Sequence, residues 1–328
     1  MDRYSLITNI HKRDFSQKKI LLIGAGKMAF QYATTLKKMN IKNVYVISKT
    51  FSKTCKFCKE FKFQPIDNLE NFLENNKIHL IIVTPSIDVT IKILKQCLSR
   101  NQKNILLEKP VSLYKNEIKR LIPKTKHKRV IIGYNRLTYP NYIKLKQLID
   151  NDGGITSCKF SLTARIEKIN FSNGIKDFHK RWGTYNGIHV ISLVYDLIGK
   201  PKTILGHNSG SFDWHKSGSI FVGSGISEKN IPFSYHADWN SAGRWGVEIM
   251  TKNNAYRLIS LEELFVCKKN TDVWKKINFK KSYPKLKQGL AEQIAIMLDK
   301  KLEKDFELID LKRGFEILQF GNKIFNYN

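Results

Sequence analysis

Residues 18–36 read KKILLIGAGKMAFQYATTL and predict a strand, a tight glycine turn and a helix in direct succession. Residues 20–23 are apolar without polar alternation, which is typical of a strand buried on both faces of a parallel sheet. Gly24 lets the chain turn sharply, and Gly26 leaves its backbone open to a ligand. Ala29 takes the third small position, where the helix packs closely on the strand. The free N–H groups that open the helix then predict a phosphate site.

The turn has the pattern G-x-G-x-x-A, which is weak by itself because many glycine turns bind nothing. Here it follows a strand and opens a helix near the N-terminus, as the dinucleotide fingerprint requires. We therefore predict that the turn binds the pyrophosphate of a dinucleotide. The residues expected to contact it are Gly24, Gly26, Lys27 and Met28.

A second strand is expected over residues 43–48, and its end meets the adenosine ribose in dinucleotide-binding folds. An acidic residue there favours NAD, but this chain has Ser48 and Lys49 and no carboxylate at this point. A hydroxyl and a cation suit a 2′-phosphate, so we predict NADP as the cofactor, with NAD as the alternative. The competing interpretation makes Lys49 one more surface lysine.

The composition indicates a globular chain with about two domains of ~150 residues each. Its 328 residues are 42% hydrophobic and contain no long apolar run, so no membrane span is expected. The first residues lack a secretory apolar segment and the five cysteines are an odd number, so we expect a cytoplasmic protein with reduced thiols. Cys55 and Cys58 form a C-x-x-C without a second pair, which we interpret as coincidence; no metal site is predicted.

The formal net charge of +29 is large. Attraction to nucleic acid, anionic lipid or phosphorylated substrates is one interpretation. The lysines are spread through the chain, so we favour a lysine-biased composition, with an advantage for phosphate-bearing ligands. The expected partner is a small-molecule substrate, and neither nucleic acid nor a membrane.

Strands alternate with helices in the first part of the chain, which is typical of a parallel α/β sheet. The expected strands cover residues 20–23, 43–48, 78–83, 104–107 and 129–132. The expected helices cover 52–62, 87–99 and 114–122, and a further one starts after Asp67 as its N-cap. We predict a dinucleotide-binding Rossmann domain, with a doubly wound parallel sheet, over 1–132. Residues 1–18 form its N-terminal arm.

The pattern changes after Gly133 into long, often alternating runs joined by Gly, Asn and Ser. We predict an α+β domain over 133–328 with an open, mostly antiparallel sheet, which serves substrate binding and oligomerisation. Its expected strands cover residues 155–169, 202–213, 218–226, 231–238, 245–250 and 255–267, and its helices 139–150, 186–198, 286–302 and 310–325. The last two helices are candidates to pack back on the first domain. The open sheet face needs a cover, which favours a homo-oligomer.

Residues 106–113, LLEKPVSL, put a lysine at the carboxyl edge of the sheet, between a strand and a helix. Pro110 restricts the backbone of the residue before it, so Lys109 is held at the mouth of the expected crevice. A lysine there can stabilise an alkoxide as hydride leaves. The alternative is a surface ion pair of Glu108 with Lys109. The cofactor contacts expected at this edge are Thr84, Pro85, Glu108 and Lys109.

The helix expected over 186–198 is apolar nearly all round and is therefore expected to be buried. Tyr185 and His189 are four residues apart, so they share one helix face. A histidine near neutral pKa can act as general base toward a carbinol hydroxyl. The alternative is that His189 is a satisfied core histidine.

In this order, the glycine turn, Thr84-Pro85, the Glu-Lys-Pro stretch, Gly-Tyr-Asn-Arg at 133–136 and Gly-x-His at 187–189 resemble the Gfo/Idh/MocA oxidoreductase family. The resemblance covers residues 19–325. It implies a Rossmann domain packed with an open-sheet α/β domain, and NAD(P)-dependent oxidation or reduction of a sugar, cyclic polyol or related carbonyl compound. It also implies that Lys109 is the catalytic lysine and His189 the family's histidine.

One departure concerns the family pattern Asp-x-Gly-x-His-x-x-Asp, because Tyr185 and Ser192 replace both acidic residues here. Tyrosine supplies a hydrogen bond but no charge at neutral pH, so Tyr185 stays a candidate catalytic residue in a changed role. The N-terminal arm is also longer than the family usually carries.

The expected reaction is hydride transfer between a nicotinamide and a carbinol or carbonyl carbon. Arg136, Arg181 and Trp182, with Lys180 beside them, are candidates to line the substrate side, where cations suit a nucleotide-activated or acidic sugar of polysaccharide biosynthesis. Two alternatives stay open: a non-enzymatic cofactor-binding regulator on the same fold, and a reductase of a non-sugar such as a linear tetrapyrrole or imine.

Overall fold

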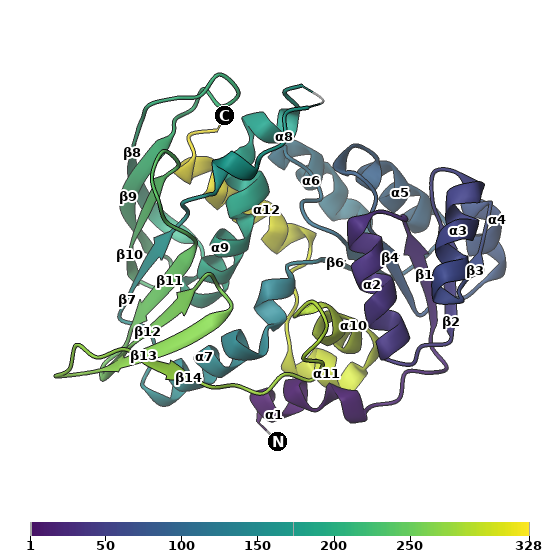
Figure 1. The fold of residues 1–328 in the computed structure, drawn as a ribbon, viewed down its shortest axis with the longest axis horizontal. Helices are drawn as coiled ribbons and strands as arrows, with labels where there is room; N and C mark the ends of the chain where they lie inside the picture. The colour runs from purple at the N-terminus through teal and green to yellow at the C-terminus, as the bar shows by residue number, and fades with distance from the viewer. Residues whose placement is uncertain (1, 173, 328) are drawn as a thin grey trace. The chain divides into compact units, whose positions relative to one another are not determined.

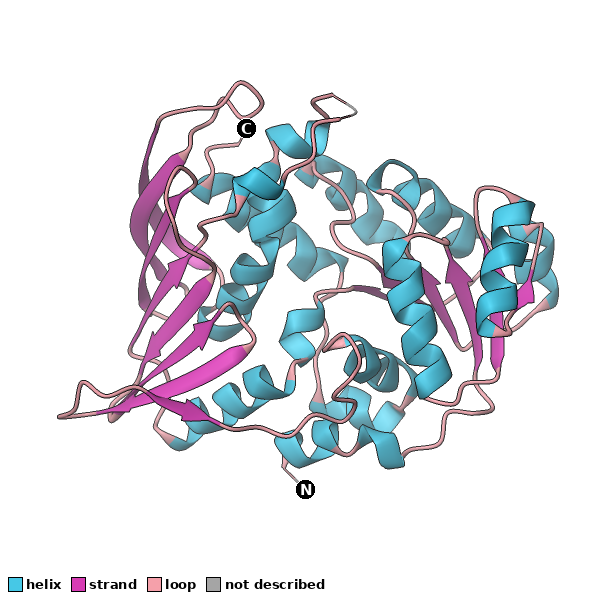
Figure 2. Cartoon of the chain, viewed as in Figure 1, coloured by secondary structure: helices cyan, strands magenta, loops and turns pink. Residues whose placement is uncertain are grey.

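The computed structural model describes residues 2–172 and 174–327, which form two compact units (Figure 1). Unit 1 runs to Thr138 and includes Lys280–Gly314; unit 2 comprises Tyr139–Phe279 and the chain from Phe315 onward. Figure 2 shows that each unit combines helices with a sheet. The functional division that we predict, a cofactor part over 1–132 and a substrate part over 133–328, stays a prediction.

Unit 1 is built on a parallel sheet of six strands in the order β3-β2-β1-β4-β5-β6. This is the doubly wound order in which the strand sequence reverses beside the first strand, the point where ligands bind in such folds. The predicted Rossmann architecture is therefore confirmed. The strands are β1 (Lys19–Ile23), β2 (Asn43–Ile47), β3 (Gln64–Pro65), β4 (Leu80–Val83), β5 (Asn104–Leu107) and β6 (Arg129–Ile132).

The helices of this sheet pack by an apolar stripe and leave the other side to solvent. In α2 (Lys27–Lys38), Ala29, Tyr32 and Leu36 are fully buried. The other helices are α3 (Phe51–Phe61), α4 (Leu69–Asn75), α5 (Ile87–Ser99) and α6 (Lys115–Leu121), with short 3₁₀ segments η2 (Ile122–Thr125) and η3 (Asn135–Thr138).

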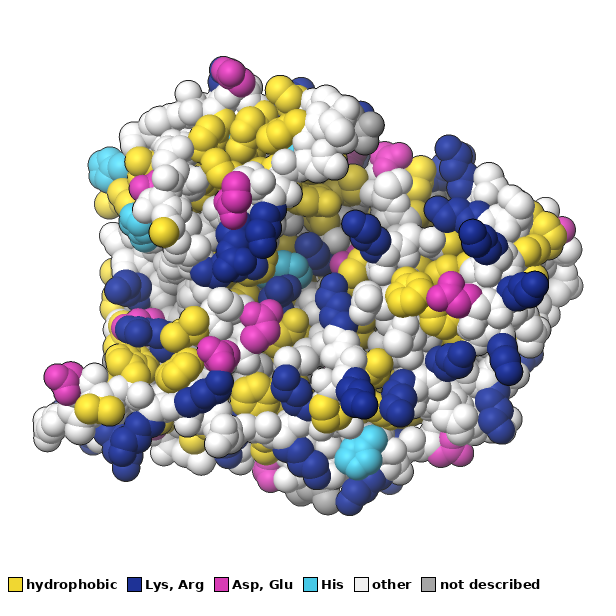
Figure 3. Space-filling view, viewed as in Figure 1, with side chains coloured by type: hydrophobic (Ala, Val, Ile, Leu, Met, Phe, Trp, Pro, Cys, Tyr) yellow, Lys and Arg dark blue, Asp and Glu magenta, His cyan; other side chains and the backbone are white. Residues whose placement is uncertain are grey.

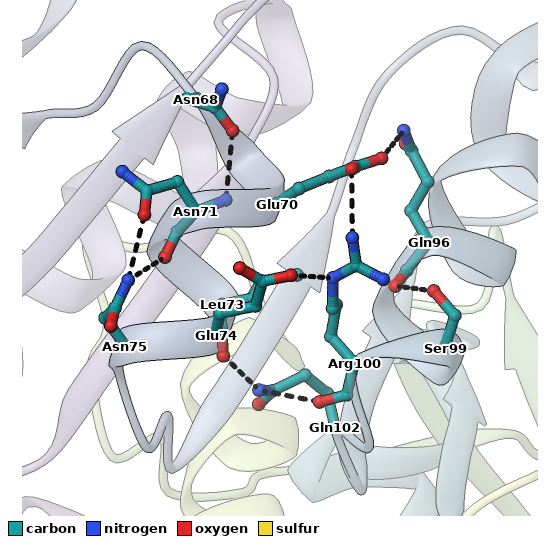
Figure 4. A network of polar contacts seen from close by, with 10 residues as sticks. All are labelled: Asn68, Glu70, Asn71, Leu73, Glu74, Asn75, Gln96, Ser99, Arg100 and Gln102. Atoms are coloured by element: carbon teal, nitrogen blue, oxygen red, sulfur yellow. Dashed lines mark hydrogen bonds and ion pairs between the residues drawn. The ribbon is translucent and has the colours of Figure 1, made fainter.

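The predicted cap of α4 at Asp67 is wrong. The helix begins one residue later, because the side chain of Asn68 accepts the Asn71 N–H at 3.0 Å (Figure 4). Arg100, which directly follows α5, pairs with two residues one turn apart on α4, Glu70 at 3.0 Å and Glu74 at 2.8 Å. These contacts fix α4 against α5.

The N-terminal arm and the segment added to unit 1 pack on each other. The arm holds α1 (Arg3–Thr8) and η1 (Ile10–Lys12), with Ile7 and Ile10 buried, and Ser282 Oγ donates to the Ile7 carbonyl at 2.6 Å. The predicted helix 286–302 is in fact two, α10 (Leu290–Leu298) and α11 (Lys300–Asp305). The extended backbone of Asp299 separates them, and its side chain caps α11.

Unit 2 is built on an eight-stranded sheet in the order β14-β13-β12-β11-β7-β10-β9-β8. Only the β7–β10 pair is parallel among its described strands, which confirms the predicted open, mostly antiparallel sheet. The strands are β7 (Ser157–Ser161), β8 (Pro201–Ser209), β9 (Ile220–Ser227), β10 (Pro232–Asp238), β11 (Gly246–Met250), β12 (Asn254–Ile259), β13 (Glu263–Lys268) and β14 (Lys275–Ile277).

One face of this sheet is packed against helices. Phe160, Phe233 and Val247 are buried there, and Phe320 of α12 (Leu311–Ile324) meets Phe233 edge-on at 5.6 Å. The strands alternate, so the opposite face carries exposed or half-buried side chains. The remaining helical segments are α7 (Pro140–Asn151), η4 (Ile166–Lys168), α8 (Asp177–Lys180) and α9 (Trp182–Ile198).

Three predicted strands of unit 2 differ from the structure. In the run 155–169, only the residues up to Ser161 pair as a strand. The apolar residues Leu162 and Ala164 beyond it are buried, although they lie outside the strand. The run 202–213 ends at Ser209. The run 255–267 is two strands, because Ser260 and Leu261 adopt positive φ and reverse the chain without a glycine or proline. The short elements α8 and β14 were not predicted.

Candidate active site

The two glycines of the turn after β1 have different roles. Gly24 has φ +117°, and a Cβ there would lie 2.5 Å from Thr84 Oγ1, so the position needs glycine for conformation and space. Gly26 is the N-cap of α2, and a Cβ there would meet no atom of the described residues within 4 Å. The backbone at Gly26 is therefore open, as a pyrophosphate site requires.

The carboxyl ends of β1, β4 and β5 are tied together beside this turn. The Thr84 N–H and hydroxyl both donate to the Ile23 carbonyl, at 2.8 and 2.9 Å. The Glu108 N–H donates to the Val83 carbonyl at 2.8 Å. These bonds bring Gly24, Thr84, half-buried Pro85 and Glu108 to one edge of the sheet, where we predict that they contact the cofactor.

The candidate ribose site at the end of β2 is only partly free. Ser48 Oγ lies 2.9 Å from Thr54 Oγ1, and the Ser48 N–H donates to the same hydroxyl at 3.0 Å. The Ser48 side chain therefore helps to organise the first turn of α3, a role that sequence reasoning missed. Lys49 is exposed, which leaves its ammonium available to a phosphate.

Glu108 and Lys109 lie in a cluster of charges at the same edge. Tyr32 OH donates to Glu108 at 3.4 Å, and burial raises the pKa of Glu108. Burial also lowers the pKa of Lys109 to about 8; Glu108 opposes this shift, whereas the positive charges of Arg136 and Lys287 reinforce it. Sequence reasoning missed Tyr32 and Lys287. Lys287 comes from the segment added to unit 1, and its sequence context carries no signal for this position.

The lowered pKa of Lys109 gives a pH prediction. The ammonium form donates to a developing alkoxide and prevails below about pH 8, whereas the neutral amine prevails above it. Above that pH, loss of the Lys109 ammonium is expected to lower the rate of carbonyl reduction at saturating substrate about tenfold per unit. A pH–rate profile from 6 to 10 measures this. A rate that stays level through pH 9.5 would contradict the assignment of Lys109 as donor.

The other predicted residues lie in unit 2, on and just before α9. The helix begins at Trp182, so Tyr185 and His189 are one turn apart on it. His189 is 7% exposed and its ring lies 5.7 Å from that of Trp245. Ser192 Oγ donates to the His189 carbonyl at 3.2 Å, so the residue at the second lost acidic position is engaged with backbone.

Aromatic rings surround the start of α9. Tyr185 packs between the rings of Phe178 at 4.9 Å and Trp182 at 5.6 Å. The Arg181 guanidinium stacks on the ring of Tyr327 at 4.9 Å, an arrangement that favours a cation. The structure therefore brings Arg181, Trp182 and Tyr185 together in unit 2, whereas Arg136 belongs to the cluster around Lys109 in unit 1.

No group of three or more His, Cys, Asp or Glu side chains that could hold a metal ion occurs among the residues that the structure describes. Cys55 and Cys58 are free thiols on α3, and burial raises the pKa of Cys58 to about 11. Within the described ranges, no helix is long and apolar enough to cross a membrane.

The strand order and the glycine turn define a Rossmann-type domain. Residues 18–136 match the model of the oxidoreductase family with an NAD-binding Rossmann fold, GFO_IDH_MocA. The match covers the predicted Rossmann part of the chain, and the predicted resemblance to this family is confirmed there.

Known proteins resemble the chain to different extents. Myo-inositol 2-dehydrogenase of Thermotoga maritima is 26% identical over 137 residues, which span 40% of this chain and 41% of that relative. A solved protein from Desulfitobacterium hafniense, described as an NADPH-dependent oxidoreductase, superposes with TM-score 0.79 at 17% identity over 95% of both chains. UDP-N-acetylglucosamine 3-dehydrogenase of Acidithiobacillus ferrooxidans superposes with TM-score 0.72 at 12% identity, over 94% of this chain and 97% of its own. At these identities the structures show a shared fold.

Proposed function

We propose that the protein is an NAD(P)-dependent oxidoreductase that transfers a hydride between a nicotinamide and a carbinol or carbonyl carbon of a sugar. The observation that carries this proposal is the position of Lys109. Its ammonium, with a pKa lowered to about 8, lies at the sheet edge that also holds the open turn at Gly26. A cation and a phosphate-binding turn at one edge suit a redox reaction on a bound dinucleotide.

The turn and the neighbouring strand ends would hold the dinucleotide, which would supply the hydride acceptor or donor. The residues that would hold it are Gly24, Gly26, Lys27, Met28, Ser48, Lys49, Thr84, Pro85, Glu108 and Lys109. Lys109 donates a hydrogen bond to the substrate oxygen and stabilises the alkoxide. His189 takes or gives the hydroxyl proton, and Tyr185 orients the substrate by a hydrogen bond.

A substrate screen tests this function. Loss of NADPH or NADH absorbance is followed with ketosugars, acidic sugars and sugar nucleotides, and the reverse reaction with the matching alcohols. We expect turnover with at least one sugar, and its loss in the Lys109→Ala enzyme. Cofactor binding without turnover on any compound of the panel, sugar or non-sugar, would favour the alternative of a cofactor-binding regulator.

The proposed substrate class rests on the cationic and aromatic residues that we predict to line the substrate. Arg136 in unit 1 and Arg181 in unit 2 suit phosphate or carboxylate groups, and Trp182 suits the apolar face of a sugar. We therefore favour a nucleotide-activated or acidic sugar. The ring cluster around Tyr185 also favours a second candidate, a planar non-sugar such as a linear tetrapyrrole, which belongs in the same screen.

Single substitutions distinguish the roles of His189 and Tyr185. His189→Asn removes the proton carrier, so it should lower the rate of alcohol oxidation more than Tyr185→Phe, which removes one hydrogen bond. The pH–rate profile of Tyr185→Phe should keep the shape of the wild-type profile. An enzyme carrying His189→Asn with the rate and profile of the wild type would mean that His189 is a core residue only.

NADP preference is proposed from Lys49 and the missing carboxylate at the end of β2. A charge-assisted contact with the 2′-phosphate contributes about 1.5–3 kcal/mol, or about 10- to 150-fold in affinity. The Lys49→Asp enzyme should therefore prefer NADH, with Lys37→Asp, on the last turn of α2, as the matched control. Fluorescence titrations with both cofactors measure the ratio. A wild type that binds NADH as tightly as NADPH would overturn this preference.

We also propose that the open sheet face joins copies of the chain. Leu205 on β8 is 77% exposed and Ile226 on the neighbouring β9 is 44% exposed. Sedimentation should show an oligomer that Leu205→Glu weakens. A wild type that stays monomeric at high concentration would contradict this proposal.

The cytoplasmic location of the protein stays a prediction.

A further inference from the structure

A groove of about 1080 Å³ in unit 1 lies alongside the glycine turn and extends away from the sheet edge. It is lined by the turn and outer side of α2, by one side of α3, and by the loop 285–287 that precedes α10. None of the predicted residues at the ends of β4 and β5 lines it. The groove therefore lies next to the crevice of Thr84, Pro85 and Glu108. It meets the turn at Gly26, and it shares Lys287 with the charge cluster around Glu108.

The lining of this groove is strongly cationic. Five of its thirteen lining residues are lysines, against 57 Lys and Arg among 328 residues of the chain, so the groove exceeds the lysine bias of the whole protein. One carboxylate, Glu60, accompanies them. The five are Lys27, Lys53, Lys56, Lys285 and Lys287. Like charges that face one space repel each other, and an anionic ligand relieves that repulsion.

Lys287 has a weak hydrogen-bond partner for an ammonium group. Its Nζ lies 3.2 Å from Met28 Sδ, in the first turn of α2. A thioether is a weak acceptor, whereas an ammonium offers three donors. The side chain is exposed, so it can exchange this contact for a phosphate oxygen. It thus bridges the loop 285–287 and the helix that starts at the glycine turn.

The floor of the groove is apolar. Phe30 is 42% exposed and meets the ring of Phe61 edge-on at 5.1 Å. Met28, Phe57 and Leu286 add to this floor. Figure 3 shows dark-blue Lys and Arg side chains gathered around a hydrophobic patch over α2 and α3. An apolar floor with a cationic rim suits a ligand that carries phosphates on a ring-bearing body.

We propose that this groove is a phosphate site, in which Lys285 and Lys287 hold phosphate oxygens opposite Lys27, Lys53 and Lys56. Two sources supply such phosphates. One is the dinucleotide at the glycine turn, in which case the inference rests on the proposed function. The other is a separate phosphorylated small molecule bound next to it.

The test compares two double variants of the full chain. Lys285→Ala/Lys287→Ala removes the two loop cations, and Lys37→Ala/Lys38→Ala removes two exposed lysines of α2 that lie outside the groove. NADPH affinity is measured by fluorescence, and inorganic pyrophosphate affinity by calorimetry with and without saturating NADPH. Circular dichroism and thermal melting check that each variant folds. Loss of charge-assisted contacts should weaken one or both ligands about tenfold or more in the loop variant only.

The outcomes show which of the two ligands supplies the phosphates, and whether the groove binds phosphate at all. Pyrophosphate displaced by NADPH points to the dinucleotide, and pyrophosphate that binds together with NADPH points to a second ligand. A wild type that binds pyrophosphate through the loop lysines but no dinucleotide would refute the proposed function and keep the groove. Affinities of the loop variant within twofold of the wild type for both probes, or no binding of either by the wild type, would overturn the proposal. Lys285→Glu/Lys287→Glu repeats the test with charge reversal.

Discussion

Lys109→Ala is expected to lower kcat by about 100-fold or more while NADPH affinity stays near that of the wild type. Removal of one donor that faces a developing oxyanion typically has an effect of this size. Lys109 lies at the carboxyl edge of the sheet beside Glu108, where burial lowers its pKa to about 8. Steady-state rates with the substrate found by screening, together with NADPH titration, separate the two effects.

Lys119→Ala, an exposed lysine on α6, is the control for a change of charge alone. Thermal melting checks that the Lys109→Ala protein stays folded when Glu108 loses its neighbouring cation. Lys109→Arg keeps a cation that does not titrate near pH 8, so any remaining activity should lose the alkaline fall. A Lys109→Ala enzyme with normal turnover would mean that the Glu-Lys-Pro stretch is structural only.

Gly26→Val is expected to abolish detectable NADPH and NADH binding while the protein keeps its fold and melting temperature. A Cβ at this position meets no atom of the described chain within 4 Å, which leaves open space for a branched side chain in the folded protein. It occupies the space that a pyrophosphate needs at the backbone of the turn. Fluorescence titration and circular dichroism measure the two properties on one sample.

Gly24→Val is the matched comparison at the same turn. At φ +117°, with a Cβ 2.5 Å from Thr84 Oγ1, the substitution strains the backbone and crowds β4. It should therefore lower the melting temperature, which Gly26→Val leaves unchanged. Undiminished NADPH affinity in Gly26→Val would remove the turn from the binding site.

Much of unit 1 could be predicted because its signals are local. Residues 20–23 and the turn at Gly24 specify a buried strand and its end within a few residues, and the same holds for residues 104–107 before Glu108. The alternation of such strands with helices predicts a parallel sheet. The boundaries in unit 2 were harder, because the reversal at Ser260 and Leu261 uses residues that give no turn signal.

The candidate site was predicted where its residues follow a strand, and missed where distant segments contribute. Lys109 follows β5 directly, whereas Lys287 lies near Glu108 only because the loop before α10 folds back on unit 1. Likewise, the Ser48 hydroxyl is engaged by Thr54, a contact that depends on where α3 begins. Side-chain partners of this kind arise from tertiary packing, which residue spacing does not encode.

The central claim is that the turn at 24–29 binds a nicotinamide dinucleotide, and titration of the wild-type protein with NADPH and NADH tests it most directly. Energy transfer from tryptophan to the reduced nicotinamide reports binding without knowledge of the substrate. Saturable binding is expected, tighter for NADPH than for NADH. Absence of a saturable signal with both cofactors, from a protein that melts cooperatively, would contradict it.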